Sequence, residues 1–159
     1  MNIIVLSDTH GKLDKAYKLI DRIETFADID LIIHCGDFLH DALDIEEETG
    51  IEVVCVPGNC DGCFERKFRT VDVPGGRILV THGHMEDVKY DTTRLLYLAE
   101  EQKCNIVCFG HSHVAVCEMI DGIRIINPGS PSRPRDGSDG SCALLVCEEG
   151  KTAATIIKY

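Results

Sequence analysis

The chain lacks both a long hydrophobic run and an excess of positive charge. No apolar run among its 159 residues approaches the roughly 20 residues that a membrane-spanning helix needs, so we expect no membrane span. The formal net charge of −11 disfavours general binding to nucleic acid, because phosphates attract clustered lysine and arginine. The opening residues, MNIIVLSDTH, lack the basic start of a cleaved signal peptide. We therefore expect a cytoplasmic location.

The cysteines form no recognisable disulfide or zinc pattern. There are nine of them, an odd number, and most lie in apolar runs such as IVCF, VVCV and CALLVC, where cysteine behaves as a small hydrophobic residue. One C-x-x-C motif, Cys60 to Cys63, is typical of a redox pair or of half a zinc site, but the sequence contains no second such motif to complete the zinc site. We expect reduced thiols, and a redox function of this pair is an alternative.

The length of 159 residues fits one domain, residues 1–159, with a single hydrophobic core. Short β-branched runs with polar endings predict five buried strands, over residues 2–6, 30–34, 51–56, 77–80 and 105–109. Helical spacing of apolar residues predicts helices over 13–27, 41–49 and 91–103, and Asp91 is a candidate cap for the last of them.

Hairpins dominate the second half of the chain. Turn residues between apolar runs predict them over residues 71–80, 114–127 and 142–159. Early alternation of helix and strand followed by hairpins predicts two packed sheets with helices outside. The remaining long segment, 127–141, reads as a loop, and long loops in compact domains are typically functional or disordered.

Each of the five predicted strands is followed directly by side chains that can bind metal. They are Asp8 with His10, Asp37, Asn59, His82, and His111 with His113. If the strands lie side by side in one sheet, their carboxyl ends open on a shared crevice. His111 and His113 alternate in GHSH, so both can face one pocket only where the backbone turns locally, which Gly110 permits.

Taken singly, these residues have structural explanations. Asp8 could cap a helix, and Asp37 and Asn59, which follow glycines, could be turn residues. Their joint arrival at five strand ends favours a metal site instead. Imidazoles exclude the all-oxygen cage of Mg²⁺ or Ca²⁺, whereas mixed donors suit Mn²⁺, Fe²⁺, Zn²⁺ or Ni²⁺. Seven donors exceed the need of one ion, so we expect two ions that share the carboxylate of Asp37.

Five motifs at these strand ends resemble those of the calcineurin-like binuclear metallophosphoesterases. In chain order they are DTH, GD, GN, H and GHSH. The resemblance covers most of the chain and is closest to small, single-domain bacterial and archaeal phosphodiesterases, which also carry GNCD and NPGS. It implies an α/β fold, a four-layer αββα sandwich of two packed mixed sheets flanked by helices. It assigns one ion to Asp8, His10, Asp37 and His113 and the other to Asp37, Asn59, His82 and His111.

The implied activity is hydrolysis of small phosphodiesters by a hydroxide that bridges two divalent ions, for which we expect Mn²⁺ ahead of Ni²⁺, Fe²⁺ or Zn²⁺. Ser130, Arg133 and Arg135 lie in the long loop and could bind the phosphate or the rest of the substrate, although a solvated loop is an equal alternative for the arginines. The catalytic candidates are Asn59 and Cys60.

Cys60 departs from the family pattern. Many members have histidine directly after the asparagine, where it can protonate the leaving oxygen, and a thiol is a weak donor. We therefore expect diesters to be hydrolysed better than monoesters with alkoxide leaving groups. A wall residue without any proton role is the alternative for Cys60.

Other functions fit the same fold. A non-catalytic scaffold, as in the related retromer subunit, could let its ligands decay, but all seven positions carry competent donors. A nuclease of the same superfamily is disfavoured by the acidic charge, the small size without a capping domain, and Cys60. The relatives suggest a homo-oligomer. We expect His84 to hydrogen-bond near the ligands and His34 to be a satisfied core residue.

Overall fold

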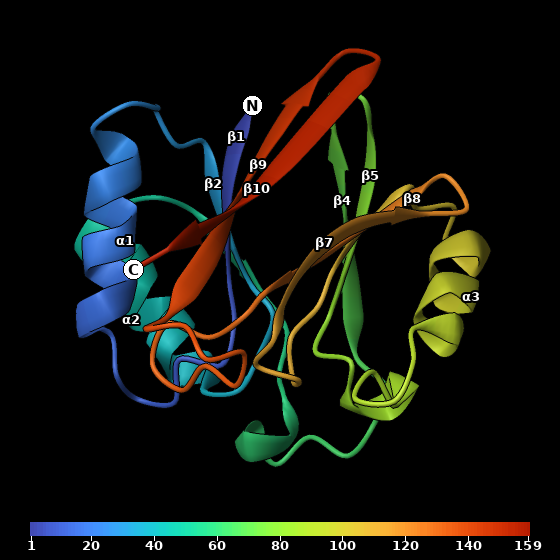
Figure 1. The fold of residues 1–159 in the computed structure, drawn as a ribbon, viewed down its shortest axis with the longest axis horizontal. Coiled ribbons are helices and arrows are strands. Elements are labelled where there is room, and N and C mark those ends of the chain that lie inside the picture. The colour runs from blue at the N-terminus through green and yellow to red at the C-terminus, as the bar shows by residue number, and fades with distance from the viewer.

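The computed structural model describes residues 1–159, which form two five-stranded sheets packed face to face (Figure 1). The first sheet has the order β10-β9-β1-β2-β3, made of β1 (Asn2–Leu6), β2 (Leu31–His34), β3 (Val53–Cys55), β9 (Ser141–Glu148) and β10 (Lys151–Lys158). The second has the order β4-β5-β6-β8-β7, made of β4 (Phe68–Val73), β5 (Gly76–Thr81), β6 (Ile106–Cys108), β7 (Ala115–Ile120) and β8 (Ile123–Pro128).

Both sheets are mixed. In the first, β1, β2 and β3 run parallel, with Leu6 opposite His34 and His34 opposite Cys55. In the second, β5, β6 and β8 run parallel. The three predicted hairpins are confirmed as β4–β5, β7–β8 and β9–β10, each antiparallel. Three parallel strand ends in each sheet therefore point the same way within that sheet.

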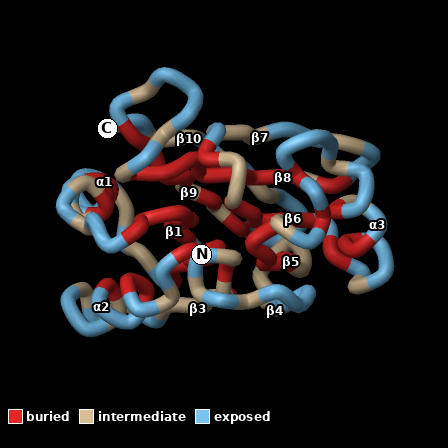
Figure 2. The backbone as a smooth tube through the Cα atoms, turned by 90° about the horizontal axis from the view of Figure 1, so that it is seen from below, coloured by how far each residue is buried: buried red, intermediate tan, exposed pale blue.

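Helices cover the outer faces of the sandwich. The first sheet is covered by α1 (Asp14–Glu24) and α2 (Leu39–Thr49), whose apolar residues form one core cluster with β1 and β2. The second sheet is covered by α3 (Thr93–Glu101), which packs on β5, β6 and β8 through another cluster. The largest cluster lies between the sheets, and Figure 2 shows the buried residues concentrated on these facing strands. The four-layer αββα arrangement is confirmed.

The helix limits differ slightly from prediction. The second helix begins at Leu39 rather than residue 41. The residue that caps α3 is Thr92, without a side-chain bond, while Asp91 one position earlier accepts a hydrogen bond from the Thr93 amide at 2.8 Å. No helix is long and apolar enough to cross a membrane.

The predicted arrangement of the five strands that precede the candidate ligands needs one correction. They do not lie in one sheet: β1, β2 and β3 belong to the first, and β5 and β6 to the second. The apolar runs of β1, β2, β5 and β6 are mostly buried, so their sequences do not distinguish one sheet from the other. The donor side chains consequently come from loops of both sheets, and four of them lie close together.

Candidate metal centre

The loops that carry the donors turn sharply, with backbone conformations that few non-glycine residues adopt. Positive φ occurs at five of the seven predicted ligands: Asp8 (57°), His10 (50°), Asp37 (58°), His111 (66°) and His113 (59°). Such strain is rare and concentrates at functional sites. The local turn expected around GHSH is confirmed, and the loops after β1 and β2 also turn through residues with positive φ.

Glycines give these loops room to approach one another. A Cβ at Gly58 would lie 2.2 Å from Oδ1 of Asp37, and a Cβ at Gly110 would lie 1.9 Å from Oγ of Ser7 and 2.7 Å from Oδ2 of Asp8. Only glycine can occupy these positions without displacing a ligand. Backbone contact therefore fixes where Asp8 and Asp37 point.

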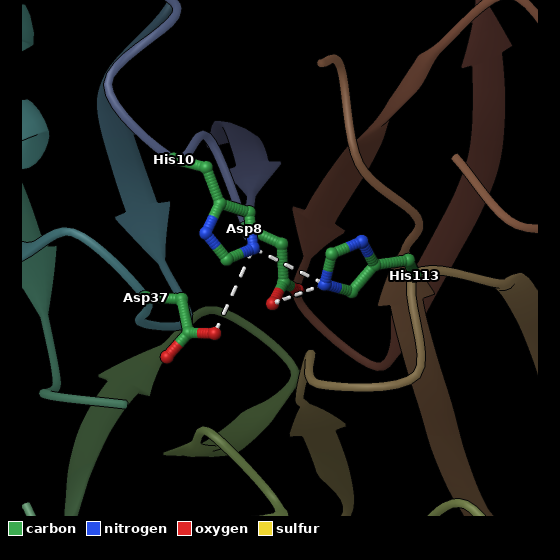
Figure 3. A group of neighbouring side chains, drawn as sticks. All are labelled: Asp8, His10, Asp37 and His113. Carbon is green, nitrogen blue, oxygen red and sulfur yellow. Dashed lines mark hydrogen bonds and ion pairs between the residues drawn. The ribbon is translucent and has the colours of Figure 1, made fainter. Parts of the chain in front are cut away.

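Four predicted ligands form a compact buried group, Asp8, His10, Asp37 and His113 (Figure 3). One donor atom from each lies within 4.8 Å of the others. Nε2 of His113 is 3.2 Å from Oδ1 of Asp8 and 3.2 Å from Nε2 of His10. Nε2 of His10 is 3.7 Å from Oδ2 of Asp37.

The group fits a cation. Nδ1 of His113 donates to the carbonyl oxygen of Arg133 at 2.7 Å, which leaves the Nε2 lone pair for a metal when the ring is neutral. This lone pair faces Nε2 of His10, and Oδ1 of Asp8 is buried without any hydrogen bond. An unsatisfied carboxylate oxygen beside two converging imidazoles is costly unless an ion or proton lies among them.

A second set of donors surrounds the other oxygen of Asp37. Nε2 of His82 is 3.4 Å from Oδ1 of Asp37 and 3.2 Å from Oδ1 of Asn59. Nδ1 of His82 donates to the carbonyl of Cys35 at 2.7 Å, so its Nε2 lone pair also faces the gap. The ring of His111 lies 5.1 Å from that of His82, but no contact joins a ring nitrogen of His111 to another predicted ligand.

Burial and the neighbouring charges set the protonation of this group. Burial by itself would raise the pKa of Asp8, but the close approach of His113 and the charge of His82 together lower it. Burial lowers the pKa of His10 against the pull of Asp37, and it lowers the pKa of His111 to about 4. These two imidazoles are neutral near neutral pH, as metal ligands must be.

The pKa of His113 moves the other way. Burial would lower it, but the carboxylate of Asp8, 3.2 Å from Nε2 of His113, raises it overall. A proton held between Asp8 and His113 occupies the position where a cation would bind, so metal binding should release it.

The long loop between β8 and β9 lies against the first group. Ser130 is fully buried, and its hydroxyl donates to the carbonyl of Asp8 at 2.8 Å and accepts from the amide of Arg133 at 2.8 Å. These bonds position the loop, and the predicted contact of Ser130 with substrate stays a prediction. The side chains of Arg133 and Arg135 are exposed beside the group.

Cys60 is exposed on a short 3-10 helix, Asn59–Asp61. Its amide donates to Oδ1 of Asp37 at 2.8 Å. Partial burial and the neighbouring carboxylate of Asp37 raise the pKa of the thiol to about 11, so the thiol is protonated at neutral pH. The nine cysteines are all unpaired.

Two of the three histidines outside the predicted ligand set, His34 and His84, lie near it and behave differently from each other. The prediction for His34 is confirmed, because both ring nitrogens of this buried residue have partners. The ring of His84 lies 5.2 Å from that of His82, but its Nε2 donates to the carbonyl of Cys63 at 2.9 Å rather than to a ligand.

Sequence reasoning missed supporting residues. Ser7 donates to Oδ2 of Asp8 at 2.6 Å. Asp61 accepts from the amides of Leu39 at 2.7 Å and Gly58 at 2.8 Å, and so joins the loops after β2 and β3. The sequence did offer a signal for Asp61, because the GNCD motif places this carboxylate two residues after the predicted ligand Asn59.

Comparison with known proteins agrees with this geometry. Residues 1–150 match the calcineurin-like phosphoesterase superfamily domain. The chain is 38% identical over 160 residues to the probable metallophosphoesterase YsnB of Bacillus subtilis strain 168, covering 100% of this chain and 90% of that protein. It is 30% identical over 147 residues to phosphodiesterase MJ0936 of Methanocaldococcus jannaschii, covering 81% of this chain and 83% of that protein.

Solved structures share the fold. A predicted phosphoesterase from Streptococcus pneumoniae TIGR4 superposes with a TM-score of 0.79 at 27% identity, covering 99% of this chain and 88% of that one. Vps29 of Entamoeba histolytica in complex with Zn²⁺ superposes with a TM-score of 0.76 at 19% identity over 99% of both chains, which shows a shared fold only. On the family match and the identity to its relatives, the chain belongs to the calcineurin-like phosphoesterase superfamily.

Proposed function

We propose that the protein is a phosphodiesterase that holds two divalent ions. The observation that carries this proposal is the orientation of Asp37, which directs Oδ2 toward His10 and Oδ1 toward His82. A carboxylate with donors on both sides is suited to bridging two ions. One ion would be held by Asp8, His10, Asp37 and His113, and the other by Asp37, Asn59, His82 and His111.

When bound, such a pair of ions supplies Lewis acidity and a lowered pKa for attacking water. The residues of the chain supply the rest. Hydrogen bonds from Nδ1 of His82 and His113 to backbone carbonyls hold both rings with Nε2 toward the gap. Ser130 anchors the loop whose exposed Arg133 and Arg135 would bind the phosphate oxygens.

Cys60 in place of histidine disfavours monoesters with alkoxide leaving groups relative to diesters and to substrates whose leaving group needs little protonation. With a pKa of about 11, its thiol is too weak an acid to protonate a leaving alkoxide efficiently near neutral pH. Substrates whose leaving group needs little protonation should therefore react fastest. The similarity to a protein named as a phosphodiesterase, at 30% identity, supports the same substrate class.

A scaffold role is not favoured, because all seven donor positions carry residues able to bind metal. Mixed imidazole, amide and carboxylate donors favour Mn²⁺, with Ni²⁺, Fe²⁺ and Zn²⁺ as competitors. We further propose one domain over residues 1–159, a cytoplasmic location and a homo-oligomeric state, with little general affinity for nucleic acid given the charge of −11.

The test is hydrolysis of bis(p-nitrophenyl) phosphate beside p-nitrophenyl phosphate, on chelator-stripped protein and after adding Mn²⁺, Ni²⁺ or Zn²⁺. We expect metal-dependent cleavage, faster for the diester, that is lost in Asn59→Ala and kept in Asn2→Ala, which changes the same residue type at the far end of β1. If folded, metal-loaded protein cleaves neither ester, a non-catalytic scaffold becomes the better explanation of this fold and site.

A further inference from the structure

A hollow lies beside the proposed metal centre, on the side of α1. Its volume is about 230 Å³, and it is lined by Lys12, Asp14, Lys15 and Ser132, with no apolar side chain. A wholly polar lining with two ammonium groups suits a charged, hydrated group and does not suit a ring or an alkyl chain. We call these four residues the lysine hollow.

Two residues of the lysine hollow bond to the backbone of the loop that carries Asp8 and His10. The hydroxyl of Ser132 donates to the carbonyl of Thr9 at 2.7 Å, and the amide of Lys12 donates to the same oxygen at 3.1 Å. Thr9 stands between Asp8 and His10. The hollow is therefore held in a fixed position by the loop that carries Asp8 and His10.

The cations around the hollow are not neutralised by the protein. Acidic residues outnumber basic ones by 27 to 16. Even so, none of the ion pairs in the structure includes the two lysines that line the hollow, Lys12 and Lys15, or the two arginines of the adjoining loop, Arg133 and Arg135. Other surface arginines do have carboxylate partners, as Arg94 has Asp87.

Three carboxylates lie near the four cations, those of Asp14, Asp136 and Asp139, so the excess is one positive charge. Asp14 is the one acidic residue that lines the hollow. In the loop, Asp136 is engaged by the hydroxyl of Ser138 at 2.7 Å. Asp139 meets Lys15 through its backbone carbonyl, and the ammonium of Lys15 also lies 4.7 Å above the ring of Tyr159. Lys15 is thus oriented without losing its charge.

We propose that the lysine hollow binds a second phosphate group of the substrate, so that the preferred phosphodiester carries a terminal phosphate on one ester arm. This inference rests on the proposed phosphodiesterase function and names its substrate class. Ammonium groups bind phosphate as point charges, and the two lysines of the hollow, with Arg133 and Arg135 in the adjoining loop, place cations together on a protein that is acidic as a whole.

The test compares two chromogenic diesters that differ only in the second phosphate: thymidine 5′-(p-nitrophenyl phosphate), and the same compound with a 3′-phosphate. With Mn²⁺ bound, we expect the phosphorylated compound to have a kcat/KM about tenfold higher, equivalent to about 1.4 kcal/mol. The ratio should fall toward one in Lys12→Gln and in Lys15→Gln. It should persist in Lys18→Gln, which removes the same charge from the same helix outside the hollow.

Equal rates for the two diesters would overturn the inference and leave the phosphodiesterase function standing. A preference that survives Lys12→Gln and Lys15→Gln, or that falls equally in Lys18→Gln, would also overturn it, because the effect would then be one of net charge. A binding measurement covers the case of no turnover. Thymidine 3′,5′-bisphosphate should bind the Mn²⁺-loaded protein about tenfold more tightly than thymidine 5′-phosphate, and equal affinities refute the hollow whatever the activity.

Discussion

The buried histidine at the end of β2 should make the stability of the protein depend on pH. His34 is completely buried. The amide of Gly36 donates to its Nδ1 at 3.3 Å, so the ring hydrogen is on Nε2, which donates to the hydroxyl of Thr9 at 3.0 Å. A second ring proton would face the Gly36 amide, which is a donor. Burial accordingly lowers the pKa of His34 to about 4, from 6.5.

The direction of the effect follows from these two values. Because the folded-state pKa lies below the unfolded one, the unfolded chain binds the proton first as the pH falls. The stability contributed by the neutral ring is complete above about pH 6.5 and is lost progressively from there down to about pH 4. Between about pH 7.5 and pH 5 the loss from His34 is about 2 kcal/mol, since one pKa unit corresponds to about 1.4 kcal/mol.

The assay is urea unfolding of metal-free protein across this pH range, for the parent chain, His34→Gln and His40→Gln. We expect His34→Gln to be less stable at pH 7.5 but to lose about 2 kcal/mol less on acidification than the parent. His40 is exposed, so its variant should keep the parent's pH dependence. If His34→Gln retained the full dependence, the argument from burial and tautomer would be refuted.

Three further changes probe the metal centre. Gly110→Ala places a Cβ 1.9 Å from Oγ of Ser7, so chemical denaturation should show a loss of about 2 kcal/mol. Adding Ser7→Gly should recover part of that loss, and no recovery would argue against the contact. Calorimetric titration of Asp37→Asn with Mn²⁺ should give at most one ion per chain, because the shared carboxylate is weakened, whereas the exposed variant Asp72→Asn should bind two. Cys60→His should raise release of phosphate from glycerol phosphate by ~10-fold or more relative to the diester rate, and an unchanged ratio would mean that position 60 has no part in leaving-group protonation.

The positions of the strands could be predicted because their apolar runs are short, β-branched and closed by polar residues. β1 and β6 are buried on both faces, so each reads as a continuous hydrophobic run with an unmistakable end. The β7–β8 turn could also be predicted from the sequence, because Asp-Gly is typical of a tight hairpin. Asp121 and Gly122 take the positive φ values, 50° and 81°, that such a hairpin needs.

The geometry of the donor loops could not be predicted in the same way. Asp and His adopt positive φ more often than most other non-glycine residues, but this preference does not identify which of them do so. At Asp37 and His113 the conformation is accompanied by contacts with Gly58 and with the loop at Arg133. Ser130 illustrates the same limit. Its sequence position in NPGS was compatible with a substrate contact, but the observed bonds to Asp8 and Arg133 depend on a fold that brings residues 122 positions apart together.

The division of the donors between two sheets also changes what the metal centre does for the fold. Each proposed ion would take ligands from both sheets: Asp8 after β1 and His113 after β6 for one, Asn59 after β3 and His82 after β5 for the other. A centre on one sheet would affect only its own loops. Here, ions that bind the folded chain add their binding free energy to the packing of one sheet on the other, so loss of metal should weaken the core between the sheets as well as the activity.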